Sequence, residues 1–261
     1  RLQEPTYTLP MVGREREKAL LAEKLALVLQ GRGQVIGVTA EAGMGKSRLV
    51  AAGIRLARRG KLIGHGGACR LDGINTPYLV WHAIWNAFFD LDPSMPLRKQ
   101  LRSLEGELED RSPEHLDALP LLGIVLGLPL PDNDFTRALP PKDRKAQLET
   151  VLIQCLESAA REAAEDGVGL LLVLEDLHWI DPVSFDLLEL MARAIENLPV
   201  LILLTYRPPD ADTGRHTLTR LAALEHFTEI TLAELNAAET EQAIRAKLAQ
   251  LFPERGGGVS P

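Results

Sequence analysis

The sequence of 261 residues contains little cysteine and no long apolar segment. Its two cysteines, Cys69 and Cys155, lie far apart and lack the spacing of a metal or redox motif. We therefore expect reduced thiols with a structural role, as in a cytoplasmic protein. No run of about 18 apolar residues is present, which excludes a membrane-spanning helix. The N-terminal segment RLQEPTYTLP has no signal-peptide character and does not begin with Met, so we expect the chain to be part of a longer protein.

An excess of positive charge is also missing. The formal net charge is −7, whereas a large nonspecific nucleic-acid surface requires clustered Lys and Arg. One basic cluster, formed by Arg55, Arg58, Arg59 and Lys61, lies at the end of a predicted helix, where positive charge is favoured by the helix dipole. We therefore expect this chain to make no direct contact with nucleic acid or with a membrane.

Short apolar segments alternate with amphipathic segments along much of the chain. This pattern predicts an α/β fold, with a parallel sheet covered by helices on both faces. Strands are predicted at residues 34–39, 61–70, 168–174, 199–206 and 226–232. Helices are predicted at about residues 13–29, 46–59, 77–89, 97–108, 113–126, 141–165, 181–197, 218–224 and 236–252. The stretch from about 72 to 167 shows no strand pattern and is predicted to be a helical insertion.

The segment AEAGMGKS, residues 40–47, has the pattern of a phosphate-binding loop. Small residues allow successive backbone N–H groups to surround a phosphate, and the N-terminus of the following helix adds partial positive charge. Lys46 would reach the β- and γ-phosphates of ATP, and the Ser47 hydroxyl would bind Mg²⁺. The pattern usually begins with glycine, where this sequence has Ala40. The alternative is a glycine-rich turn that only caps a helix, but the apolar strand before it and the apolar helix after it favour the phosphate loop.

Two acidic residues, Glu175 and Asp176, follow the predicted strand at 168–174. Ligands of open α/β sheets bind at the carboxyl ends of the strands, which places both carboxylates in the site. By their order, Glu175 would contribute to the Mg²⁺ shell and Asp176 would orient the attacking water, although Asp is more common at the metal position. The alternative is a pair of helix-capping acids in a solvated loop. Asp181, directly before Pro182, is predicted to be a helix N-cap.

Arg207 ends the predicted strand at 199–206 and is followed by two prolines. A cation at this strand end would contact the γ-phosphate and stabilise the charge that develops during phosphoryl transfer. The alternative is a surface arginine at a strand terminus. The residues expected to act in catalysis are therefore Lys46, Glu175, Asp176 and Arg207, and those expected at the metal are Ser47, Glu175 and Asp176.

Four segments, VGRE (12–15), GKSRL (45–49), EDLHW (175–179) and TYR (205–207), together resemble the signal-transduction ATPases with numerous domains (STAND). These are P-loop NTPases close to the AAA+ group. The sequence is similar to the ATPase domains attached to bacterial class III adenylate and guanylate cyclases and to large LuxR-type transcriptional activators. The resemblance covers most of the chain outside the helical insertion.

The resemblance implies a P-loop NTPase fold whose five parallel strands have the order 5-1-4-3-2, with the Arg207 strand between the two motif-bearing strands. Residues 1–261 would form one ATPase core, with the insertion at about 72–167 and the start of a truncated helical lid at about 236–261. The adenine would lie against Val12, Gly13 and Arg14. The residues expected to hold the nucleotide are Val12, Gly13, Arg14, Ala40, Glu41, Ala42, Gly43, Met44, Gly45, Lys46, Ser47 and Arg48.

Three functions remain open from the sequence. The first is a regulatory switch that binds ATP and Mg²⁺ and hydrolyses ATP slowly to ADP within a multidomain signalling protein. The second is a DNA-associated AAA+ ATPase of the initiator or loader type, and the third is a nucleotide-binding scaffold without hydrolysis. The acidic balance of charge favours the switch. Its flanking effector would be a cyclase or a helix-turn-helix domain, the oligomeric state stays open, and without a full lid the chain alone would bind nucleotide weakly.

Overall fold

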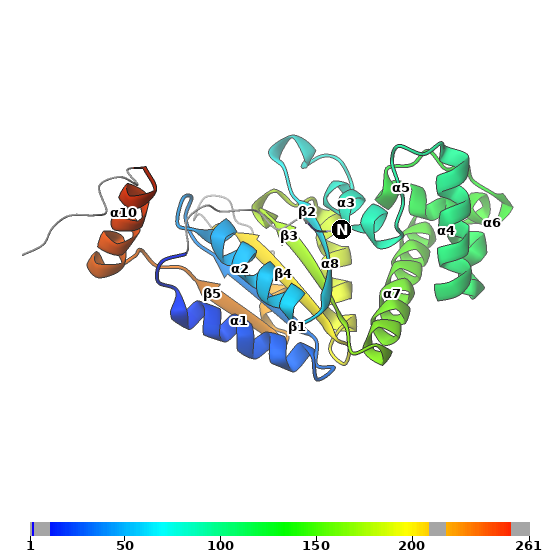
Figure 1. Cartoon of the computed structure of the whole chain (residues 1–261). Coiled ribbons are helices and arrows are strands. Elements are labelled where there is room, and N and C mark those ends of the chain that lie inside the picture. Colours follow the sequence, from blue (N-terminus) through cyan, green and yellow to red (C-terminus); the bar gives the residue numbers. More distant parts are fainter. Residues whose placement is uncertain (1, 3–10, 209–217, 252–261) are drawn as a thin grey trace, which may run out of the picture.

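The computed structural model describes residues 2, 11–208 and 218–251. Its centre is a sheet of five parallel strands in the order β2-β3-β4-β1-β5 (Figure 1). The strands are β1 Gln34–Thr39, β2 Leu62–Ala68, β3 Gly169–Glu175, β4 Val200–Tyr206 and β5 Phe227–Thr231. Read from the opposite edge, this is the order 5-1-4-3-2, so the predicted α/β fold and its strand order are confirmed.

The three middle strands are apolar because both of their faces are covered. Every residue of β1 and β4 is buried, as are all residues of β3 except its last. The register pairs Thr39 at the end of β1 with Tyr206 at the end of β4, and Leu174 of β3 with Leu204. The carboxyl ends of these three strands therefore lie side by side.

Helices form a layer on each face of the sheet. One face packs against α1 (Glu15–Val28) and α2 (Lys46–Arg59), which share a core cluster with Ile36, Val38 and Leu203. The other face packs against α8 (Pro182–Ala194) and against part of the insertion (Figure 1). The remaining short elements outside the insertion are η3 Leu177–Trp179 and α9 Thr219–Ala222.

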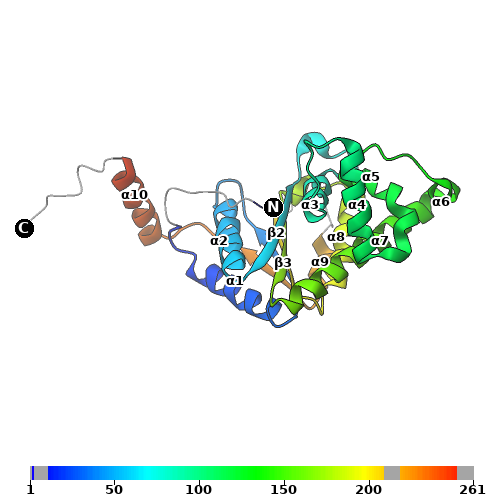
Figure 2. The same ribbon diagram turned by 45° about the vertical axis from the view of Figure 1, so that its right-hand side comes forward.

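The segment between β2 and β3 is helical and gathers at the β2 end of the sheet (Figures 1 and 2). Its elements are η1 Leu71–Gly73, α3 Leu79–Phe88, α4 Leu97–Arg111, η2 Pro113–Leu122, α5 Gly123–Leu126, α6 Asp134–Ala138 and α7 Pro141–Glu165. Aromatic side chains of α3, among them Trp81, Trp85 and Phe88, join this group to the sheet within one continuous core.

Two parts of the insertion differ from the prediction. The single helix expected at 113–126 is observed as the 3-10 helix η2 followed directly by the short α-helix α5. Within η2, His115 departs from helical backbone angles, and Pro120 has no N–H to donate to an α-helical hydrogen bond. The short helix α6 was not predicted. Its Asn133 side chain accepts a hydrogen bond from the Thr136 N–H, and the Thr136 hydroxyl accepts one from the Asn133 N–H, which stabilises a helix too short to show periodicity.

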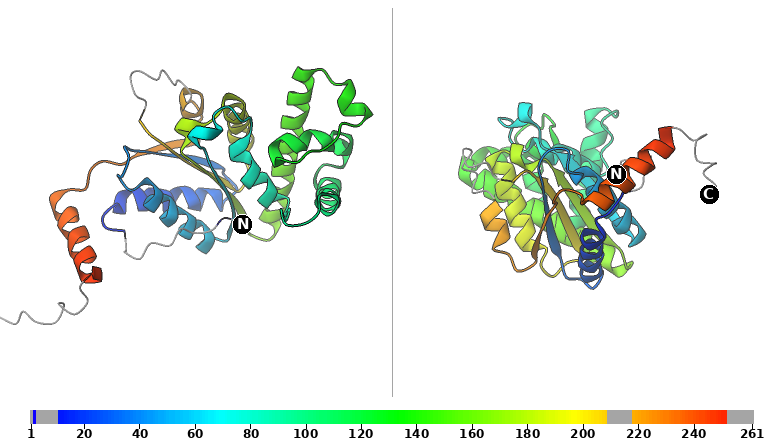
Figure 3. Two further views of the ribbon diagram at one scale, coloured as in Figure 1. Left: turned by 90° about the horizontal axis from the view of Figure 1, so that it is seen from above. Right: turned by 90° about the vertical axis from the view of Figure 1, so that its left-hand side faces the viewer.

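The last helix, α10 (Ala237–Leu251), extends away from the sheet at the end opposite the insertion (Figure 3). All of its residues are at least partly exposed. Residues 1, 3–10, 209–217 and 252–261 lie outside the described residues, and with them the predicted last residue of this helix, 252, and the rest of the expected lid segment to 261. Within the described residues, the helices are all too short or too polar to cross a membrane.

Candidate functional site

Three strand ends bring the predicted site residues to one edge of the sheet. The loop 40–47 follows β1, Glu175 and Asp176 stand at the end of β3, and Arg207 follows β4. Because β4 lies between β1 and β3, the arginine stands between the loop and the acid pair. The parallel sheet thus assembles groups that lie far apart in the sequence.

The loop owes its shape to two glycines with left-handed backbone angles. Gly43 has φ 81° and Gly45 has φ 94°, and a Cβ atom on either would meet nothing within 4 Å. The backbone conformation, not a lack of space, therefore requires glycine at both positions. Ala40 is not among the described residues with positive φ, which explains how alanine is accommodated at the first position of the pattern.

Lys46 turns back over the loop. Its Nζ atom donates hydrogen bonds to the Ala40 carbonyl at 2.5 Å and to the Glu41 carbonyl at 2.9 Å. Burial lowers the pKa of Lys46, the positive charge of Arg207 lowers it further, and Asp176 and Glu41 act in the opposite direction. The structure therefore brings Lys46, Arg207 and Asp176 within electrostatic reach of one another.

The two neighbouring acids have different surroundings. Glu175 is half-buried, and burial followed by the charge of Asp176 raises the pKa of its carboxyl group. Asp176 has φ 57°, and its N–H donates a hydrogen bond of 2.9 Å to the Thr205 hydroxyl at the end of β4. The side chain of Asp176 is 51% exposed and lies 4.0 Å from Nδ1 of His178. Asp176 is thus the carboxylate open to a ligand.

The helix that follows the acid pair starts as predicted. The Asp181 side chain accepts a hydrogen bond of 2.9 Å from the Ser184 N–H, which confirms Asp181 as the N-cap of α8. Trp179 is partly buried and packs against the core. The acid pair is therefore held between a buried strand and a firmly capped helix.

A magnesium site built from protein groups alone is not found. The described part of the chain contains no group of three or more His, Cys, Asp or Glu residues placed to hold a metal. Magnesium in nucleotide sites is commonly bound by one or two protein oxygens together with phosphate oxygens and water. The exposed Ser47 hydroxyl beside the loop and the carboxylates at the end of β3 are a donor set of this kind.

A pocket of about 600 Å³ opens beside the loop. Its wall combines three segments: Met11, Val12 and Arg14; Gly43, Met44, Gly45 and Arg48; and Glu234, Leu235, Thr240 and Ala243.

The Arg14 guanidinium donates a hydrogen bond of 2.5 Å to the Ala233 carbonyl. Gly13 has φ 68°, and a Cβ atom there would lie 2.5 Å from the Glu239 carboxylate. The segment 12–14 is therefore packed closely against the start of α10.

Sequence reasoning missed the part of this pocket that comes from the C-terminal side. Asn236 and Glu239 form a reciprocal cap at the start of α10: each donates its N–H to the other's side chain at 2.9 Å. Their spacing in the sequence is a signal for a helix start. It does not predict that the helix approaches the loop. Thr205, which holds the backbone of Asp176, was also not singled out.

Glu175→Gln is expected to raise the melting temperature, and more so at neutral than at acidic pH. The folded protein holds a proton on Glu175 more tightly than an unfolded chain does. Stability is therefore greatest below the usual glutamate pKa and falls as pH rises through the raised pKa. Glutamine keeps the shape of the side chain and removes the destabilisation that results from burying a charged carboxylate. Thermal melts without nucleotide at about pH 4 and about pH 7 would measure it.

The matched control is Glu105→Gln, which makes the same exchange at an exposed position of α4 and should change the melting temperature little at either pH. An increase for Glu175→Gln that is equal at both pH values would contradict the assignment of a buried, destabilising charge to Glu175.

Comparison with known proteins gives a family and a longer relative. Residues 10–203 match the family model described as the AAA ATPase domain. An uncharacterized protein of Rhizobium meliloti (strain 1021) is 30% identical over 245 residues, which cover 91% of this chain and 22% of that protein. The chain thus spans about a fifth of the length of the curated relative that it matches.

Some solved structures are similar to this chain, at lower sequence identity. The HORMA:CdnC:Trip13 complex of E. coli MS115-1 contains a chain that is 12% identical, with a TM-score of 0.49 over 96% of this chain and 70% of that one. The ORC2 protein of Aeropyrum pernix, in ADPNP-ADP complexes, is 14% identical, with a TM-score of 0.48 over 95% and 55%. At these values the similarity carries no conclusion about function.

Proposed function

This chain belongs to the AAA ATPase domain family, and from that membership we propose that it works as a slow ATP-hydrolysing switch within a larger signalling protein. Membership in the family implies nucleotide binding. The proposal adds that the loop 40–47 holds Mg-ATP, that the chain distinguishes ATP from ADP, and that this difference controls other domains.

The observation that carries the proposal is the placement of Lys46, Asp176 and Arg207 after the carboxyl ends of three adjacent strands, where the charges of Arg207 and Asp176 act on Lys46. Burial is the main cause of the lowered pKa of Lys46, and repulsion by the nearby Arg207 cation adds to it. A bound triphosphate places negative charge between them and removes the repulsion. The pair is therefore suited to an anion of high charge density.

Each group has a role that its position supports. Lys46 would donate hydrogen bonds to the β- and γ-phosphates in place of the Ala40 and Glu41 carbonyls. Arg207, on the neighbouring strand end, would contact the γ-phosphate. Asp176, the more exposed acid, would accept a hydrogen bond from the attacking water.

Ser47 and Glu175 would contribute oxygens to Mg²⁺, which neutralises phosphate charge when it is bound. Burial raises the pKa of Glu175, and a bound cation would offset that effect by favouring the charged carboxylate. The adenine would occupy the pocket of about 600 Å³ between Val12, Arg14 and the start of α10. Because α10 packs against this pocket, a change of the bound nucleotide would move α10 and would in this way be transmitted to other domains of the protein.

Four sequence segments support the finer classification. VGRE (12–15), GKSRL (45–49), EDLHW (175–179) and TYR (205–207) occur in the order found in STAND-type ATPases, which are regulatory modules of multidomain proteins. The matched relative is several times longer than this chain, which agrees with a modular context. We propose a cytoplasmic STAND-class module with an adjoining cyclase or DNA-binding effector.

Arg207→Ala tests whether the site distinguishes the two nucleotides. Because ATP alone carries the γ-phosphate, the substitution should weaken ATP binding by about tenfold to a hundredfold and leave ADP binding nearly unchanged. Titration calorimetry with Mg-ATP and Mg-ADP on the wild type and the variant would measure it. Arg193→Ala is the control, since this residue pairs with Glu189 on α8.

An equal loss for ATP and ADP would make Arg207 a structural residue. A wild-type chain with the same affinity for both nucleotides would remove the basis of the proposed switch.

A further inference from the structure

The strand end that carries Arg207 is held by hydrogen bonds on both sides. Thr205, two residues before Arg207, accepts the hydrogen bond from the Asp176 N–H at the end of β3. Tyr206, directly before Arg207, donates a hydrogen bond of 2.5 Å from its hydroxyl to Oε1 of Glu229 on β5. The last two residues of β4 are therefore connected to different strands, one on each side of β4.

The hydrogen bond to β5 crosses an intervening strand. In the sheet, β1 lies between β4 and β5 (Figure 1), so the Tyr206 side chain passes over β1 to reach Glu229. The register pairs Tyr206 with Thr39 and Glu229 with Gly37, so the side chain also runs back along β1 by two residues. One side chain thus connects strands that are not neighbours in the sheet.

Gly37 leaves the space that this crossing requires. A Cβ atom at Gly37 would lie 2.7 Å from the Tyr206 hydroxyl oxygen and 2.9 Å from Cε1 of the same ring. It would also lie 3.0 Å from Cζ of Phe227, the first residue of β5. The close approach of the tyrosine therefore requires glycine at this position of β1.

The surroundings of Tyr206 favour this hydrogen bond. The residue is 2% exposed and belongs to the core on the α8 face of the sheet. A buried hydroxyl without a partner would destabilise the fold, and Glu229 supplies the acceptor. Burial, followed by the hydrogen bond to Glu229 and its charge, raises the pKa of Tyr206. The phenol therefore keeps its proton at neutral pH and remains the donor.

The position of Arg207 depends on this strand end. Arg207 is exposed, and within the described part of the chain its guanidinium makes no hydrogen bond or ion pair. The direction of its side chain is therefore determined by its backbone, which follows directly from Thr205 and Tyr206.

We propose that Tyr206 and Glu229 are positioning residues for Arg207, an inference that rests on the proposed ATP switch. The hydrogen bond between them holds the end of β4 so that the Arg207 guanidinium reaches the γ-phosphate of ATP. Neither Tyr206 nor Glu229 contacts the nucleotide itself. Without their hydrogen bond, Arg207 would adopt a wider range of positions, and ATP would lose part of a contact that ADP never makes.

Tyr206→Phe tests the proposal, because phenylalanine keeps the buried ring and removes only the hydroxyl that reaches Glu229. Titration calorimetry should show the affinity for Mg-ATP lowered about fivefold to tenfold and the affinity for Mg-ADP unchanged. A residue that serves folding alone would lower the melting temperature and would affect both nucleotides equally. The ratio of the two affinities is therefore the deciding measurement.

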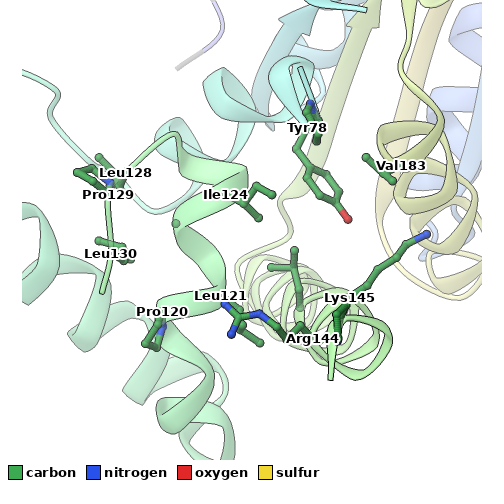
Figure 4. A pocket seen from close by; sticks show the side chains of 14 residues that line it. Tyr78, Pro120, Leu121, Ile124, Leu128, Pro129, Leu130, Arg144, Lys145 and Val183 are labelled. Carbon is green, nitrogen blue, oxygen red and sulfur yellow. The ribbon is translucent and has the colours of Figure 1, made fainter. Parts of the chain in front are cut away.

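Tyr78→Phe is the matched control, since Tyr78 is a second buried tyrosine, with 4% exposure. Its ring points into a pocket of about 550 Å³ in the helical insertion, with the hydroxyl turned toward α7 (Figure 4). Within the described residues this hydroxyl makes no hydrogen bond, so the same exchange breaks no connection to the nucleotide site. Both nucleotides should bind this variant as they bind the wild type.

Substitutions of Glu229 test the same hydrogen bond from the acceptor side. Glu229 is exposed, so its exchange leaves the core intact. Glu229→Ala removes the acceptor and should lower ATP affinity as Tyr206→Phe does. Glu229→Gln keeps a side-chain oxygen that can accept the hydrogen bond and should retain most of the affinity. When Tyr206→Phe is added to Arg207→Ala, no further loss is expected, because the arginine that Tyr206 positions is absent.

The experiment separates a failure of this inference from a failure of the proposed function. If Arg207→Ala loses ATP affinity selectively while Tyr206→Phe binds ATP as the wild type does, the positioning role is wrong and the proposed switch stands. Additive losses in the double variant would also overturn the positioning role, because residues that act through one contact do not add. If Arg207→Ala affects ATP and ADP equally, the proposed function fails, and the positioning role fails with it.

Discussion

Lys46→Ala is expected to weaken Mg-ATP binding by about 2–4 kcal/mol, or roughly thirty- to eight-hundred-fold in the dissociation constant. The ammonium group lies over the loop within hydrogen-bonding distance of two carbonyls. Alanine removes this charge from a site where Arg207 supplies further positive charge, and the phosphates lose their nearest donor. Titration calorimetry with Mg-ATP would measure the change.

The loss should come from binding and not from unfolding. Lys46 makes contacts only within its own loop among the hydrogen bonds of the described residues, so the melting temperature of the variant should stay close to that of the wild type. Lys99→Ala removes an exposed lysine of α4 and should leave ATP affinity unchanged. An unchanged affinity in Lys46→Ala would contradict the assignment of residues 40–47 as a phosphate loop.

The same lysine should make the affinity for ATP decrease as the pH rises. In the free protein the pKa of Lys46 lies below its usual value. Bound phosphate favours the charged ammonium and raises that pKa. The affinity for ATP should therefore be greatest at pH values below the pKa of Lys46 in the nucleotide-free protein, and it should fall as the pH rises through that pKa. Lys46→Ala should not show this fall.

Most of the regular elements follow from local sequence signals. The strand β1 and the helices α2 and α7 begin and end at the predicted residues. Each has a strong boundary: Gly45 with its left-handed backbone caps α2, and the pair Pro140 and Pro141 starts α7. Where the pattern was weaker, at 113–126, the predicted single helix is a 3-10 helix with a kink at His115, followed by a short α-helix.

The site could be predicted only in part, because some of its contacts join distant segments. The loop and the acid pair are contiguous motifs. In contrast, the pocket wall joins Met11 to Thr240 and Ala243, and the Thr205 hydroxyl reaches the Asp176 N–H from the neighbouring strand. Such contacts depend on strand order and on the path of the chain after β5, which no local pattern specifies.

Asp176→Asn is expected to leave nucleotide affinity nearly unchanged and to lower ATP hydrolysis by about a hundredfold to ten-thousandfold. The carboxylate is the more exposed of the two acids and lies within electrostatic reach of Lys46. An amide of the same shape cannot accept the proton of an attacking water. Phosphate release under single-turnover conditions would detect even slow hydrolysis, and calorimetry on the same samples would report binding.

The substitution suits this position because it leaves the backbone alone. Asp176 has φ 57°, a left-handed conformation that Asn adopts at least as readily as Asp, and its N–H bond to Thr205 does not involve the side chain. Asp90 also has a positive φ, of 48°, so Asp90→Asn is a control for the same exchange outside the site. Equal losses of binding and turnover in Asp176→Asn would move Asp176 to the metal-binding role, and Glu175 would then be the residue that positions the water.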